Sequence, residues 1–139
     1  MGNYKIMTVL SGSMEPAIKM GSVVVVKPAD DYKIGDVITF GSYSKTKPPT
    51  THRIHNIKVL KGRVSYITKG DANEEPDNRE ISEREIIGKV LFSIPYLGYA
   101  VDFTKKPIGF ALIIIIPAGI VIADEVKKIY AELKKKKTE

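Results

Sequence analysis

Ser11-Gly12-Ser13-Met14-Glu15-Pro16 is the stretch of this chain that says most about its fold and chemistry. Gly12 permits a tight or left-handed backbone next to Ser13, and Pro16 ends any regular element just after it. A serine on such a turn can present its hydroxyl and a backbone N–H on the same side, as acyl-transfer chemistry requires. Ser-Gly-Ser alone is ordinary loop composition, so the interpretation depends on the motifs that follow.

Further motifs follow this serine in a fixed order. They are Gly35-Asp36-Val37-Ile38-Thr39-Phe40, Thr51-His52-Arg53-Ile54 and Lys69-Gly70-Asp71-Ala72-Asn73, with Asp77 six residues beyond Asp71. A nucleophile, a base and two carboxylates are therefore available, which makes hydrolysis the first chemistry to consider.

Taken together, these motifs resemble the type I signal peptidases, in their archaeal and endoplasmic-reticulum branch. That branch carries Ser-Gly-Ser-Met-x-Pro at its nucleophile, His-Arg where the bacterial branch has a catalytic lysine, and Gly-Asp-x-Asn with a second Asp further on. The stretch Ile94-Pro95-Tyr96-Leu97-Gly98-Tyr99 resembles the end of the family's catalytic domain, so the similarity covers about residues 8–100. It implies a membrane-bound serine endopeptidase that removes N-terminal signal peptides from translocated precursor proteins.

Composition is compatible with that expectation. A chain of 139 residues without cysteine is one domain by length, and it has no disulfide or thiol chemistry. His52 and His55 have no carboxylate cluster around them in sequence, so we expect no metal site and no cofactor. Of the net charge of +6, residues 1–104 carry +2 and residues 105–139 carry +4. The surplus lies in a short tail instead of a broad face, which argues against nucleic-acid binding.

The tail predicts a membrane helix. Residues 107–123 form 17 consecutive positions without a charge, which is the short limit for a helix that crosses a bilayer. A buried core helix is the alternative, but about 100 residues of β-rich chain cannot surround a helix that is apolar on all sides. The heavier lysine cluster, Lys134 to Lys137, lies on the C-terminal side and predicts a cytoplasmic C-terminus.

We therefore expect two regions, with membrane lipid as one partner. Residues 1–104 form an extracytoplasmic catalytic β domain, and residues 105–139 form a C-terminal transmembrane helix (about 107–123) with a basic cytoplasmic tail. The location is the cell membrane, or the endoplasmic-reticulum membrane in a eukaryote, and the translocation machinery is a candidate partner. The family normally has a membrane helix before the serine motif, but residues 1–10 are too few and too polar to span a bilayer. Either such an anchor was removed from this chain, or the C-terminal span anchors it alone.

Between its ends the chain predicts short antiparallel strands, rich in Val, Ile, Thr, Tyr and Phe and separated by turn residues. The expected strands are Lys5–Leu10, Ser22–Lys27, Asp36–Phe40, Thr50–Leu60, Arg63–Lys69 and Ile86–Ile94. Lys61-Gly62 suits a hairpin turn, and the charged segment Asp71 to Arg84, which contains Pro76, suits a loop. The fold class is mainly β: an antiparallel domain of the signal-peptidase type, followed by one membrane helix.

The motifs also predict roles. Ser13 attacks the scissile carbonyl and His52 is its base, because an imidazole accepts and returns protons near neutral pH. The family resemblance implies Asp77 as the carboxylate that holds His52, with Asp71 organising its loop or a nearby cation. The backbone N–H of Ser13 is the obvious oxyanion donor. Ser11 occupies the position of a hydroxyl donor in the bacterial branch, although it can equally bond within its own turn.

Two other interpretations stay open. A Ser-Lys enzyme would use Lys69 as the base, but a lysine base requires a pKa lowered by burial, and Lys69 lies beside a charged loop. A membrane-tethered β domain that only binds would leave Ser13 without catalytic function. In a strand over residues 50–59, both Arg53 and His55 face away from His52, so neither is expected in the site.

Overall fold

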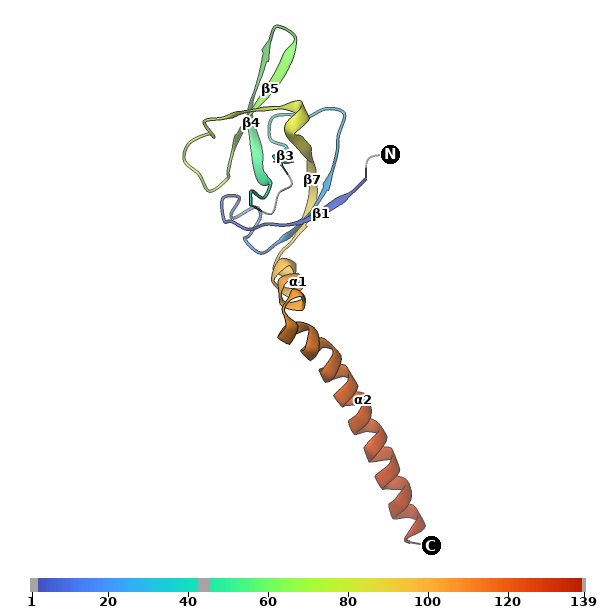
Figure 1. Ribbon diagram of the computed structural model, residues 1–139. Coiled ribbons are helices and arrows are strands. Elements are labelled where there is room, and N and C mark those ends of the chain that lie inside the picture. Colours follow the sequence, from blue (N-terminus) through green and yellow to red (C-terminus); the bar gives the residue numbers. More distant parts are fainter. Residues whose placement is uncertain (1–2, 43–45, 139) are drawn as a thin grey trace. The chain divides into compact units, whose positions relative to one another are not determined.

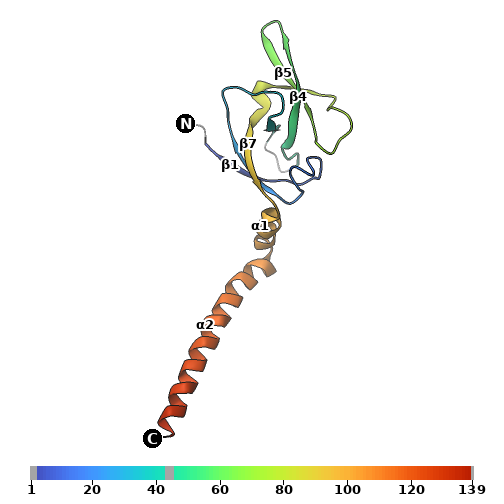
Figure 2. The ribbon, with the colours of Figure 1, turned by 180° about the vertical axis from the view of Figure 1, so that it is seen from behind.

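The computed structural model describes residues 3–42 and 46–138. The described strands form one antiparallel sheet in the order β1-β2-β7-β3-β4-β5-β6, and the sheet curls on itself (Figures 1 and 2). The elements are β1 (Lys5–Thr8), β2 (Val23–Lys27), β3 (Val37–Phe40), β4 (Thr50–Leu60), β5 (Arg63–Lys69), β6 (Glu80–Ser82), a 3₁₀ turn (Glu83–Glu85), β7 (Ile86–Ile94), α1 (Leu97–Lys105) and α2 (Pro107–Lys136). The predicted mainly β class is confirmed.

The six expected strands are all present, within two residues at each end. Lys61 and Gly62 form the β4–β5 turn with φ of 49° and 77°, as the two left-handed positions of a tight hairpin require. Gly12 is different, because it is not among the residues with positive φ. Its turn is closed by the N–H of Glu15, which donates to the Gly12 carbonyl at 3.1 Å.

Two expectations were incomplete. The segment from Asp71 to Arg84 is not loop throughout, because Glu80–Ser82 pairs with β5 as strand β6. Buried Ile81 is the one apolar anchor in this charged stretch, and it packs with Tyr66 and Ile54. The helix α1 was also not expected from the sequence.

The core consists of two clusters of buried side chains. One includes Met7, Val24 and Val26 of β1 and β2, together with Met14 and Ile18 from the loop that carries Ser13. The other includes Ile38, Phe40 and Ile54 of β3 and β4. Because Met14 is only 1% exposed, the residue after Ser13 is anchored in the core, which fixes the serine loop against the sheet.

The contacts divide the chain into two units, Met1–Tyr99 and Ala100–Glu139. The second unit contains most of α1 and the 30-residue helix α2, which is long and apolar enough to cross a membrane. The helix continues past residue 123 into the basic tail, where Lys128 pairs with Asp124 and Glu125 one turn earlier. Such pairs favour helix in a charged segment.

Candidate active site

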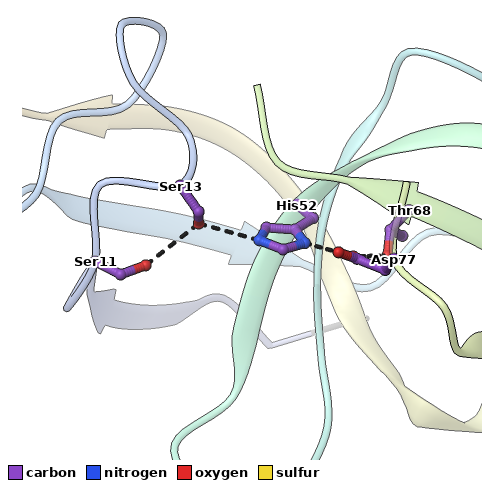
Figure 3. A network of polar contacts seen from close by, with 5 residues as sticks. All are labelled: Ser11, Ser13, His52, Thr68 and Asp77. Atoms are coloured by element: carbon purple, nitrogen blue, oxygen red, sulfur yellow. Dashed lines mark hydrogen bonds and ion pairs between the residues drawn. The ribbon is translucent and has the colours of Figure 1, made fainter. Parts of the chain in front are cut away.

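The structure brings three of the predicted site residues into one hydrogen-bonded line. His52 lies between Ser13 and Asp77, with its Nε2 3.0 Å from Ser13 Oγ and its Nδ1 2.5 Å from Asp77 Oδ2 (Figure 3). His52 belongs to β4, Ser13 to the β1–β2 loop, and Asp77 to the loop between β5 and β6. Residues 39 and 25 positions apart in sequence therefore meet at one point.

The hydrogen bonds fix the tautomer of His52. A carboxylate only accepts hydrogen bonds, so the Nδ1 atom beside Asp77 carries the proton. Nε2 is then unprotonated and accepts the hydrogen bond from the hydroxyl of Ser13. The His52 side chain is largely buried, and its ring packs with the Phe40 ring in a T-shaped arrangement with 6.3 Å between ring centroids. This packing leaves the imidazole little freedom to turn.

Ser11 lies beside the serine hydroxyl, with 3.2 Å between the two Oγ atoms (Figure 3). Because the Ser13 proton points to His52, Ser11 is the donor in this contact. The Ser11 hydroxyl is thus already directed toward the reacting atom.

Asp77 is attached to β5 at two points. Its backbone N–H donates to the Thr68 carbonyl at 2.8 Å, and its Oδ2 accepts a hydrogen bond from Thr68 Oγ1 at 2.6 Å. Sequence reasoning did not single out Thr68. The available signal was the alternation of β5, which directs Thr68 and Lys69 to opposite faces of the sheet.

Asp71 is held by Arg53 and not by the histidine. The guanidinium donates from Nε to Oδ1 at 2.9 Å and from Nη2 to Oδ2 at 2.7 Å, a bidentate pair. The Arg53 hydrogen bonds lower the pKa of Asp71 from its ordinary value of 3.8, against a smaller opposing effect of burial. Asp71 raises the pKa of Arg53 in turn. The nearby cation expected for Asp71 is therefore Arg53, and the two form a bidentate ion pair.

The turn that contains Asp71 supports the backbone of the serine. The N–H of Ala72 donates to the Ser13 carbonyl at 2.9 Å. At Gly70 an added Cβ would lie 2.6 Å from that same carbonyl oxygen, so only glycine fits. The Gly70–Asn73 turn, closed by the N–H of Asn73 donating to Gly70 at 3.0 Å, thus packs directly behind Ser13.

Lys69 lies on the other face of the sheet. It pairs directly with Arg53 across β4 and β5, so the two side chains share a face, whereas Thr68 and His52 share the opposite one. His55 is exposed at a β-bulge between Ile54 and Asn56. The geometry thus gives neither Lys69 nor His55 access to Ser13.

A surface pocket of about 320 Å³ opens beside Ser13 and His52. Its walls are small or apolar residues for the most part: Thr8, Val9, Leu10, Ser11, Pro48, Pro49, Thr50, Thr51 and Asn73. Such a pocket can receive uncharged side chains of a substrate next to the serine hydroxyl.

No protein-family model matches the chain. Among individual proteins, it is 31% identical over 146 residues to the signal peptidase complex catalytic subunit SEC11 of Ogataea parapolymorpha, covering 90% of this chain and 82% of that protein. Signal peptidase I W of Bacillus subtilis (strain 168) is 40% identical over 86 residues, which are 60% of this chain and 44% of that protein. For SEC11 of Lachancea thermotolerans the identity is 35%, over 68% of this chain and 62% of that protein.

The chain spans less than two thirds of the length of the last two relatives, but most of the Ogataea subunit. Two kinds of signal peptidase therefore match the chain, one over 90% of its length and the other over 60%. The chain belongs to the type I signal peptidase family, a family of serine endopeptidases that remove signal peptides.

Proposed function

We propose that this chain is a membrane-bound endopeptidase that cuts signal peptides from translocated precursor proteins, with Ser13 as nucleophile. The observation that carries the proposal is the line of hydrogen bonds from Ser13 through His52 to Asp77. The family relationship supplies the reaction class, and the line of hydrogen bonds supports the roles of the residues.

In the first half of the reaction, Ser13 Oγ attacks the scissile carbonyl carbon while its proton moves to His52 Nε2. Asp77 keeps the imidazole in the tautomer that can accept this proton, and it stabilises the resulting imidazolium. The backbone N–H of Ser13 and the hydroxyl of Ser11 stabilise the oxyanion. His52 then protonates the leaving amine, and the signal peptide remains as an ester on Ser13.

In the second half, a water molecule attacks the ester carbonyl carbon while His52 removes a proton from that water. The carboxylic acid product leaves, and the proton returns to Ser13. Asp71 takes no part in proton transfer in this proposal. Through Arg53 and the Gly70–Asn73 turn, it supports the backbone carbonyl of Ser13.

We expect the enzyme to require small residues before the cut. Signal peptides end in small residues of the Ala-x-Ala type, and the pocket beside Ser13 is the proposed place for them. With purified full-length protein in detergent, Trp or Lys at either small position should reduce cleavage of a precursor by about 100-fold or more.

The matched control is a precursor with Trp at the intervening position, which should be cut at a near-normal rate because that side chain points away in an extended substrate. Undiminished cleavage of substrates with Trp at a small position would contradict the proposed substrate class.

We further propose that residues 1–104 form an extracytoplasmic catalytic domain, and that residues 105–139 form a span with a cytoplasmic tail. The lysine excess after the apolar stretch supports this orientation, and α2 has sufficient length. The location is then the cell membrane, or the endoplasmic-reticulum membrane in a eukaryote. The length and apolar composition of α2 support membrane lipid as a proposed partner. The Ogataea and Lachancea relatives are named as catalytic subunits of a signal peptidase complex, which supports the translocation machinery as another.

The orientation predicts which side of a vesicle exposes the tail. Trypsin added to sealed vesicles with the cytoplasmic face outward should remove a C-terminal tag by cutting at Lys134–Lys137, and should leave the β domain intact. The same vesicles treated with trypsin and its inhibitor together should keep the tag. Loss of the β domain with retention of the tag would mean that the orientation is inverted.

A further inference from the structure

We propose that Thr68 is a positioning residue for catalysis: its hydroxyl holds the Asp77 carboxylate in the orientation that His52 requires. The inference rests on the proposed function and adds a fourth member to the Ser13–His52–Asp77 line (Figure 3). Thr68 does not contact the substrate or the reacting atoms in this proposal. It acts through Asp77.

The first observation is the hydrogen bond itself. Thr68 Oγ1 lies 2.6 Å from Asp77 Oδ2, the same oxygen that accepts from His52 Nδ1 at 2.5 Å. A carboxylate has no proton to give, so Thr68 must be the donor. Two donors that converge on one oxygen hold that oxygen in place more firmly than the imidazole alone would.

The second observation is that Asp77 needs this support. Asp77 follows Pro76 in a segment with neighbouring charges, Glu74 and Glu75, which are exposed. A triad carboxylate on a mobile loop would be a poor partner for a base. The hydrogen bond from the Asp77 N–H to the Thr68 carbonyl at 2.8 Å attaches the backbone as well. Thr68 therefore holds Asp77 by main chain and side chain together.

The third observation is the rigidity of Thr68. Its side chain is 0% exposed, and across the sheet it pairs with Ile54, which is 1% exposed. A β-branched side chain in a strand has restricted χ1 rotation. Burial also keeps water away from the Thr68 hydroxyl, so Asp77 Oδ2 is its defined acceptor.

The test compares variants that differ only in the hydroxyl. Thr68→Val, which keeps the shape, should lower kcat on the order of 10- to 100-fold and leave KM within about twofold, since a hydrogen bond to a charged group is lost. Thr68→Ser should retain kcat within about threefold of wild type. Because Val could perturb packing, Thr68→Ser and Thr68→Ala form a second pair in which both members lack the methyl group.

The matched control is Thr39→Val. Thr39 is 1% exposed, but its hydroxyl bonds Thr51 Oγ1 at 2.8 Å and not the carboxylate. This variant should lose thermal stability to a degree similar to Thr68→Val and keep its kcat. Equal kcat in the Ser and Ala variants of Thr68, or equal losses in Thr39→Val and Thr68→Val, would overturn the positioning role. An active Ser13→Ala protein would instead overturn the proposed function, so the two failures are distinguishable.

Discussion

Replacement of Ser13 by Ala is expected to lower kcat by a factor on the order of 10⁴ or more, with the fold unchanged. The variant removes one oxygen atom, and that oxygen is the nucleophile in the proposed reaction. The anchors of the loop, Met14 and Ile18, remain in the core. His52→Ala should cause a loss of similar size, because nucleophile and base act as one unit and their effects do not add. Single-turnover cleavage of a precursor by folded protein measures both.

A substitution at Lys69 is the control that separates a Ser-His-Asp enzyme from a Ser-Lys enzyme. Lys69→Met keeps most of the aliphatic side chain and removes the amine, which lies on the face of the sheet opposite His52. Its cleavage rate should stay within about twofold of wild type. A Ser-Lys enzyme would give the reverse pattern, with Lys69→Met inactive and His52→Ala active, and that pattern would refute the assignment of His52.

Most of the fold could be predicted because local signals and tertiary structure agree. Val23–Val26 has a strand former at every position. Lys61-Gly62 supplies the left-handed turn that the hairpin of β4 and β5 requires. The strand Glu80–Ser82 lacked such a signal. This strand has three residues and one buried side chain, Ile81. Its extended conformation therefore depends on pairing with β5 more than on its own composition. Strands of this kind are specified by their neighbours.

The site follows a similar division. Ser13 and His52 could be named from ordered motifs, because each residue type is required by the chemistry itself. Two aspartates met the same requirement, and the resemblance to the family implied Asp77. Thr68 could not be named, since a threonine in a strand is ordinary and its significance depends on where the loop with Asp77 returns. The partner of Asp71 was also open in the sequence. Strand alternation predicted that Arg53 faces away from His52, but only the fold shows Arg53 reaching Asp71.

Asp71 should contribute to the stability of the fold in a way that depends on pH. The pKa of Asp71 is lower in the folded protein than its ordinary value of 3.8, chiefly because Arg53 donates two hydrogen bonds to it. Its contribution to stability is therefore complete above the ordinary value and is lost as the pH falls through the folded pKa. Asp71→Asn should lower the melting temperature by about 5 °C at neutral pH. In acid, where Asp71 is protonated in wild type, the difference should vanish.

The two aspartates should then separate clearly in the kinetics. Asp77→Ala removes the carboxylate that fixes the tautomer of His52, so kcat should fall on the order of 10⁴-fold with little change in KM. Asp71→Ala leaves the line from Ser13 to Asp77 in place and weakens only the turn behind Ser13. The kcat of Asp71→Ala should fall by less than about 100-fold, because Ser13, although displaced, still has His52 as its base. Single-turnover rates of the two variants, measured below both melting temperatures, make the comparison. A folded but inactive Asp71→Ala beside a near-wild-type Asp77→Ala would mean that the two roles are exchanged.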